Sequence, residues 1–246
     1  MAGTKLAVRV VLISCCVAIP QAGQLDSARP AIDAYGTAIQ AAEQEASHGR
    51  LEAAFKAVGP LRQALLRHRE AGGSVLESLS EQEFTELGHE LVGVVDSREE
   101  AVFVEPDVAF FGRLAARGDP ADRAFFAALG TTYPRSVWPI YIDQQTDVSG
   151  CVRYGSGTLV SSYFTWAAVR RQHPKRYEEA SGKHLDAIVR ALTESTCACS
   201  DRASVEQELT EFLRRADATD VRTRVEARLA AVRSGGADMR FRCHSG

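Results

Sequence analysis

Apolar residues recur every three or four positions along most of the chain, which is the spacing of amphipathic helices. In the first third this pattern predicts three helices, over residues 27–48, over residues 51–70 and from Ser80 to Val94. The third begins with Ser80-x-x-Glu83, which has the form of a capping box. Pro60 lies inside the second, where we expect it to kink or split the helix. We therefore predict an N-terminal helical bundle over residues 24–98.

The helical spacing continues in the rest of the chain. Pro106 and Pro120 each suit a first helical turn, and Asp119 is a suitable N-cap for the second of these helices. Between the two halves, the Val-Phe-Val sequence of residues 102–104 could be extended. Later helices are predicted around residues 163–173, 185–192, 204–213 and 221–232. Residues 99–246 are thus predicted to form a second, mainly helical domain.

Residues 133–160 interrupt the helical pattern with several Pro and Gly residues. The apolar stretch 137–142 is typical of a short strand, and residues 152–154 and 158–160 could pair with it through glycine turns. The predicted fold class is therefore mainly α, a multi-helix bundle with a small irregular β element around residues 137–160.

The first residues have the pattern of a secretory signal peptide. Lys5 and Arg9 precede an almost wholly apolar run from Val10 to Ile19, and small residues follow near Ala22. The run is shorter than the roughly 20 residues that cross a bilayer, and no second candidate span follows. We therefore predict a signal peptide over residues 1–23 and an exported protein, periplasmic or secreted, without a transmembrane span.

The same segment has a second interpretation. Leu12-Ile13-Ser14-Cys15 has the form of a bacterial lipoprotein cleavage box, in which Cys15 would carry a lipid anchor. The apolar stretch between Arg9 and Cys15 would then be short, so we favour the signal peptide. A bacterial origin is indicated by the composition, which is rich in Ala and Arg, contains four Lys and has no Asn.

Four cysteines follow the predicted signal peptide: Cys151, Cys197, Cys199 and Cys243. An even number in an exported protein indicates disulfides. A bond between Cys197 and Cys199 would close a small, strained ring, so we expect one of them to pair with Cys151 and the other with Cys243. Each pairing closes a loop worth about 3–4 kcal/mol in the chain-entropy model. The C-terminal part is therefore expected to be stapled by two disulfides.

Two other interpretations of these cysteines remain open. Cys197-Ala198-Cys199 could be a redox pair, because strained disulfides are the oxidising ones. Alternatively, Cys197, Cys199, Cys243 and His244 could hold zinc. Structural zinc sites prefer two to four residues between paired cysteines, and export favours oxidation, so we prefer the disulfides.

The charge balance excludes the usual profile of a nucleic-acid-binding protein. The chain has 29 Lys and Arg residues against 32 Asp and Glu residues, for a net charge of −3. The one basic cluster covers residues 170–176 and could meet phospholipid headgroups or an acidic partner. The simpler interpretation is a solvated helix end, where cations also favour the helix dipole.

Aromatic residues gather between residues 133 and 177, which hold both Trp residues and five of the six Tyr residues. Aromatic faces beside amides and carboxylates suit a cleft for a sugar or a peptide. The candidate ligand-binding residues are Trp138, Tyr141, Asp143, Gln145, Asp147 and Tyr154. The alternative is that these aromatic rings form the core of the disulfide-tied domain.

Catalytic signatures are weak in this sequence. Asp143 and Asp147 could act as the acid/base pair of a glycoside hydrolase, whose carboxylates stand roughly 5–9 Å apart. His89-Glu90 begins a zinc-protease motif, but position 93 is Gly and the second His is missing. We expect the other histidines on the surface: His48, His68, His173, His184 and His244.

These observations favour a non-catalytic, exported bacterial envelope protein that binds a protein or a cell-envelope component. The alternative is a secreted or periplasmic hydrolase that acts on a cell-wall or extracellular substrate, with a site near residues 138–154. The sequence contains no phosphate-binding glycine loop and predicts no cofactor.

Overall fold

The computed structural model describes residues 25–68, 72–99, 101–134, 137–146 and 148–243. In this part of the chain the fold is mainly α, as the sequence predicts. The predicted signal peptide and Cys15 lie outside the described residues. The helices are α1 (Arg29–Gln44), α2 (Arg50–Leu65), α3 (Glu81–Glu90), α4 (Val108–Ala115), α5 (Pro120–Thr132), α6 (Thr158–Gln172), α7 (Glu178–Glu194), α8 (Arg202–Arg215) and α9 (Asp220–Ser234).

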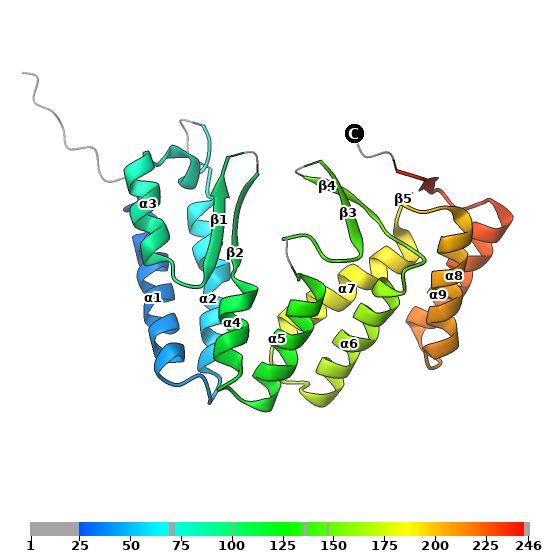
Figure 1. Cartoon of the computed structure of the whole chain (residues 1–246), viewed down its shortest axis with the longest axis horizontal. Coiled ribbons are helices and arrows are strands. Elements are labelled where there is room, and N and C mark those ends of the chain that lie inside the picture. Colours follow the sequence, from blue (N-terminus) through cyan, green and yellow to red (C-terminus); the bar gives the residue numbers. More distant parts are fainter. Residues whose placement is uncertain (1–24, 69–71, 100, 135–136, 147, 244–246) are drawn as a thin grey trace, which may run out of the picture.

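Most of these helices pack against the next one in the chain and form hairpins, namely α1–α2, α4–α5, α6–α7 and α8–α9. The hairpins follow one another in a row from the blue to the red end of the chain (Figure 1), and contacts between α2 and α4, α5 and α6, and α7 and α9 join neighbours. One cluster of buried apolar side chains extends from Ala28 to Met239. No helix within the described ranges has both the length and the apolar character that a bilayer crossing requires.

A β-hairpin separates the first helical hairpin from the second. Strands β1 (Val94–Arg98) and β2 (Val102–Pro106) are antiparallel, which confirms the extended conformation expected for residues 102–104. The predicted extension of the third helix to Val94 is wrong, because the chain turns at Gly93 in the left-handed region (φ +79°) and starts a strand. The predicted domain boundary at residue 98 falls between these paired strands, and the division into two domains stays a prediction.

The helix ends follow local sequence signals. The capping box at the start of α3 is confirmed, with Glu83 accepting from the Ser80 backbone N–H at 2.8 Å. α1 ends at Gln44 instead of residue 48. α2 is not split at Pro60, because the buried side chains of Val58 and Leu61 hold both halves of the helix in the core.

The β element predicted around residues 137–160 is present, but the strand predicted over residues 137–142 is wrong, because the first strand begins only at Ile142. Strands β3 (Ile142–Thr146), β4 (Ser149–Val152), β5 (Cys197–Ala198) and β6 (Arg240–Phe241) form a sheet in the order β3-β4-β5-β6, in which only the first pair is antiparallel. The predicted strand at residues 158–160 is wrong, since these residues form the first turn of α6.

A buried carboxylate explains why the chain enters a helix at that point. Glu208 of α8 is 1% exposed and accepts three backbone N–H groups, those of Gly155 and Gly157 at 2.8 Å and of Val160 at 3.1 Å. The carboxylate thus satisfies donors that the start of α6 would otherwise leave without partners. Glycine at 155 and 157 permits the positive φ angles that this turn requires.

The cysteines pair as the sequence predicts. Cys151 bonds to Cys197 and Cys199 bonds to Cys243, with sequence separations of 46 and 44 residues. Cys197 and Cys199 are therefore not bonded to each other. The sulfur atoms of Cys151, Cys199 and Cys243 lie within 4.8 Å of one another because the two disulfides are neighbours, and His244 lies outside the described residues.

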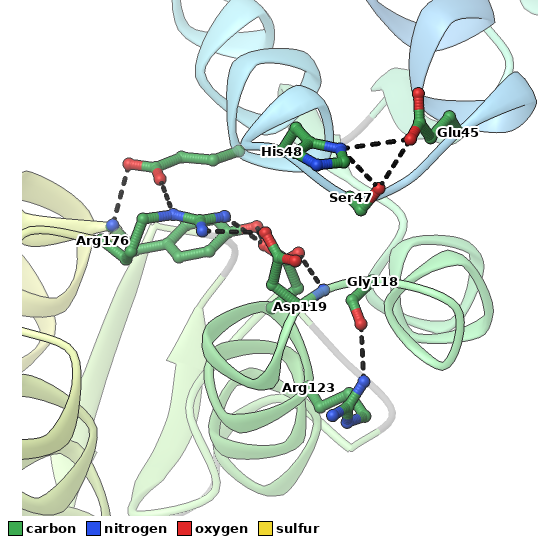
Figure 2. A network of polar contacts seen from close by, with 10 residues as sticks. Glu45, Ser47, His48, Gly118, Asp119, Arg123 and Arg176 are labelled. Carbon is green, nitrogen blue, oxygen red and sulfur yellow. Dashed lines mark hydrogen bonds and ion pairs between the residues drawn. The ribbon is translucent and has the colours of Figure 1, made fainter.

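A buried ionic cluster joins the first three helical hairpins. Arg176, in the α6–α7 loop, donates to Glu52 of α2 at 2.6 Å, to Asp119 at 3.1 Å and to Asp122 of α5 at 2.8 Å. Figure 2 shows Arg176 and Asp119 facing each other below the α1–α2 turn. Asp122 is fully buried, and it also accepts from the Tyr177 hydroxyl at 2.7 Å. Arg176 is therefore only partly exposed, at 27% of its side chain, whereas the whole basic cluster was expected to be a solvated helix end.

Replacing Arg176 with Met should lower the free energy of unfolding by about 3–5 kcal/mol, because removal of one partner leaves buried carboxylates without a compensating charge. The measurement is urea unfolding of both proteins at neutral pH. Arg171→Met, at an exposed position close by, is the matched control and should have little effect. A loss below about 1 kcal/mol in the Arg176 variant would show that the carboxylates are solvated.

Replacing Glu208 with Gln should lower the free energy of unfolding by about 2–3 kcal/mol, because the amide loses charge-assisted bonds and presents an NH₂ group to backbone donors. Glu206→Gln, two positions earlier on α8 and ion-paired with Arg233 at 3.5 Å, should change it by less than about 0.5 kcal/mol. Equal effects of the two substitutions would contradict the capping role of Glu208.

Candidate functional site

The structure places two of the predicted aromatic ligand residues in the core. Tyr141 and Tyr154 are 3% and 4% exposed, and the Tyr154 hydroxyl donates to the Ala191 carbonyl at 2.5 Å. Burial raises the pKa of Tyr154 to about 12. Trp138 is half-buried and lies near Gly150 of β4. These rings contribute to packing, which is the alternative that the sequence left open.

The polar candidates are brought together only in part. Asp143 and Gln145 both lie on β3, where Asp143 pairs with Arg153 at 3.2 Å. The Gln145 amide donates to the Asp143 carbonyl at 3.4 Å and contacts the Cys199 sulfur at 3.3 Å. Asp147 lies outside the described residues, so the hypothesis of an Asp143–Asp147 catalytic pair stays a prediction.

A cleft of about 870 Å³ lies elsewhere in the molecule. Its walls come from α2, the β1–β2 hairpin with the start of α4, the end of α5 and the start of α7, which Figure 1 shows in the first two thirds of the row. The volume is in the range of roughly 300–1,000 Å³ that is typical of small-molecule sites. None of the five described ligand candidates (Trp138, Tyr141, Asp143, Gln145 and Tyr154) lines it.

The interior of the cleft is aromatic. Phe55 of α2 lies 5.2 Å from Phe125 and 6.0 Å from Tyr177, measured between ring centroids, and Tyr177 stacks on Phe125 at 3.9 Å. At the mouth, Val95 and Val137 are 40% and 42% exposed. Apolar surface is thus open to water on two sides of the cleft, and a ligand that covered it would gain hydrophobic free energy.

The charged side chains that line the cleft are already paired. Lys56 contacts Glu52 at 2.8 Å, Lys183 contacts Glu179 at 2.6 Å, and Arg62 forms an ion pair with Glu105. A fourth group, Asp107, caps α4 by accepting from the Ala109 and Phe110 N–H groups at 2.9 and 3.0 Å. Burial raises the pKa of the Glu105 carboxyl, although Arg62 opposes this shift. Each charged side chain of the described lining therefore has a partner, and the Arg62–Glu105 pair joins α2 to β2.

Two uncharged polar groups complete the lining. The His184 ring stacks on Trp166 with ring centroids 4.2 Å apart. The Tyr133 ring also neighbours His184, with centroids 5.7 Å apart. Burial lowers the pKa of His184 to about 4, while burial and the Glu105 carboxylate raise the pKa of Tyr133 to about 12. Both side chains are therefore neutral at pH 7, and neither forms a side-chain hydrogen bond with another described residue.

The sequence did not identify most of this site. His184 was expected on the surface, and Phe55, Phe103 and Glu105 are ordinary members of a helix and a strand. Tyr133 does fall at the edge of the aromatic-rich segment. The β-prone stretch 102–104 is a second sequence signal, because it forms part of β2 and so of one wall of the cleft. It does not indicate which elements form the opposite wall.

The arrangement is suited to binding. Its described lining contains no Ser, Thr or Cys residue, and its carboxylates are occupied by ion pairs or by the α4 cap. The one group of potential metal ligands in the described ranges is the set of three cysteines, whose sulfur atoms are already in disulfides. Comparison with protein-family models, with curated proteins and with solved structures finds no significant match.

The lowered pKa of His184 has a measurable consequence. The unfolded chain takes up a proton at this residue below about pH 6.5, whereas the folded protein does so only near pH 4. His184 should therefore make no difference above pH 7 and should reduce stability progressively as the pH falls from 6.5 to 4, by about 2–3 kcal/mol.

His184→Phe keeps a ring on Trp166 and should remove this part of the pH dependence. The measurement is the free energy of unfolding in urea at pH 7.5 and at pH 4.5, for the wild type and the variant. His89→Phe, at an exposed position on α3, is the control and should retain the wild-type pH dependence. If His184→Phe also retained it, the imidazole would be freely protonated in the folded state.

Proposed function

We propose that this chain is an exported, non-catalytic binding protein of the bacterial envelope, and that its ligand inserts an apolar portion into the cleft between α2, β1–β2, α5 and α7. The ligand is an envelope component or a protein. The observation that carries the proposal is the cleft itself. Its lining is rich in aromatic side chains, and Val95 and Val137 expose apolar surface that a bound ligand would cover.

Export is supported by two independent features. The two disulfides fit an oxidising compartment, and the sequence of residues 1–23 has the three regions of a secretory signal peptide. A binding role is supported over a catalytic one because the charged side chains of the described lining are engaged in ion pairs or in the α4 cap, and the Arg62–Glu105 pair joins α2 to β2. The hydrolase alternative retains the Asp143–Asp147 spacing as its basis.

The cleft can be blocked at Gly59. This residue lines the cleft on α2, and a Cβ atom added there meets no atom within 4 Å. Gly59→Trp should therefore fold and fill the space with an indole ring. Its matched control is Gly36→Trp, because Gly36 is also a helical glycine with open space at Cβ, but it lies on α1 away from the cleft.

We expect the wild type and Gly36→Trp to bind diphenylhexatriene, a hydrocarbon dye that fluoresces in apolar surroundings, with equal affinity. Gly59→Trp should weaken dye binding by about tenfold or more, since the indole displaces the dye from its apolar contacts. The measurement is a fluorescence titration, with circular dichroism to show that both variants fold. Equal binding by Gly59→Trp and Gly36→Trp, or no binding by the wild type, would refute the cleft as the binding site.

A further inference from the structure

The chemistry of the cleft narrows the class of ligand, and this step rests on the function proposed above. A charged ligand that enters the cleft loses water and must find an opposite charge there. The cationic groups Lys56, Lys183 and Arg62 each have a carboxylate partner, and Asp107 is occupied by two backbone N–H groups. A carboxylate or phosphate would have to share one of these cations with its present partner, and an ammonium group would have to compete with Arg62 for Glu105 or with Lys183 for Glu179.

The unused polar capacity of the cleft is uncharged. The Tyr133 hydroxyl can donate and accept a hydrogen bond, and a neutral His184 ring offers one donor and one acceptor. The two rings are neighbours, with centroids 5.7 Å apart, and both side chains line the cleft. This pair suits a hydroxyl, a carbonyl or an amide group, each of which pairs with neutral donors and acceptors.

The positions of these groups set the orientation of a ligand. His184 is anchored by its stack on Trp166, and the Trp166 indole donates to Thr132 at 2.9 Å, which fixes both rings at the end of α5. The aromatic surface of Phe55 and the exposed Val95 and Val137 lie around the rest of the cleft. The polar pair therefore lies beside apolar side chains, and the other polar side chains of the described lining are Tyr177 and the charged groups already named.

We propose that the cleft binds an uncharged amphiphile, a mainly hydrocarbon molecule whose single hydroxyl, carbonyl or amide group is held by Tyr133 and His184. The hydrocarbon portion packs against Phe55 and Tyr177 and covers Val95 and Val137. Such a molecule requires no new ion pair from the described lining, and its one polar group has hydrogen-bonding partners there.

The test uses three ten-carbon probes that share a chain and differ in the head group: decanol, decanoate and decylammonium. Each displaces diphenylhexatriene from the wild-type protein at pH 7.5, below the concentration at which the probe aggregates. We expect decanol to bind about tenfold or more tightly than either ion. Equal displacement by all three, or preference for decanoate or decylammonium, would overturn the proposal while dye binding itself would still support the proposed function.

Variants of the polar pair give the second readout. Tyr133→Phe and His184→Phe preserve the rings and should each weaken decanol binding by about three- to tenfold, since each removes one hydrogen bond. The affinity for the hydrocarbon dye should not change, which separates head-group recognition from a general disturbance of the cleft. Unchanged decanol affinity in both variants would overturn the proposed role of Tyr133 and His184. Loss of dye and decanol binding together would show that the rings only shape the cleft, and would overturn it as well.

Discussion

The guanidinium of Arg176 is the contact on which the arrangement of the first three helical hairpins depends. It binds Glu52 from α2 and both Asp119 and Asp122 at the start of α5, and these residues are separated from it by 124, 57 and 54 positions in the chain. A planar group with five donors can bind three carboxylates at once, which a lysine cannot do with the same geometry. The hydrogen bond from Arg176 lowers the pKa of Asp119, so the pairing is maintained at neutral pH.

The same cluster positions the interior of the cleft. Tyr177 follows Arg176 and has a positive φ of 49°, a strained conformation for a tyrosine. Its backbone N–H donates to Glu52 at 2.8 Å and its hydroxyl to Asp122 at 2.7 Å, so both ends of the residue are held by carboxylates of the cluster. With both ends fixed, the ring stacks on Phe125 and makes an edge-to-face contact with Phe55, which also lines the cleft. The ionic cluster thus compensates the strain and determines where an apolar wall stands.

The sequence predicts what is local in this fold. Helical spacing, the capping box at Ser80 and the pairing of Cys151, Cys197, Cys199 and Cys243 follow from neighbouring residues or from a small number of alternatives, and the structure confirms them. The predicted strand at residues 158–160 is wrong for a non-local reason. Glu208, about fifty positions later, caps that turn and makes a helix the better conformation.

The cleft likewise depends on residues that are far apart in the sequence, from Phe55 to His184. Arg176 has the sequence context of a solvated helix end, and its burial depends on carboxylates that no short motif connects to it. His184 likewise occupies an ordinary helical position, and only the approach of Trp166 from α6 and Tyr133 from α5 turns it into a buried neutral imidazole. Periodicity predicts which face of α7 is apolar, but it does not predict the identity of the helix that covers it.

Disulfide bonds hold the C-terminal part of the fold together, whereas the walls of the cleft are joined by non-covalent contacts. One disulfide joins β4 to β5, and the other joins the residue after β5 to the segment after β6, beside the C-terminal sheet. The cleft walls are joined instead by ion pairs, by the Arg62 hydrogen bond to the Val104 carbonyl at 2.8 Å and by aromatic packing around Phe55. Contacts of this kind can adjust by small movements, whereas a disulfide cannot. The C-terminal sheet is thus held covalently, whereas the position of the β1–β2 hairpin against α2 depends on non-covalent contacts such as those of Arg62.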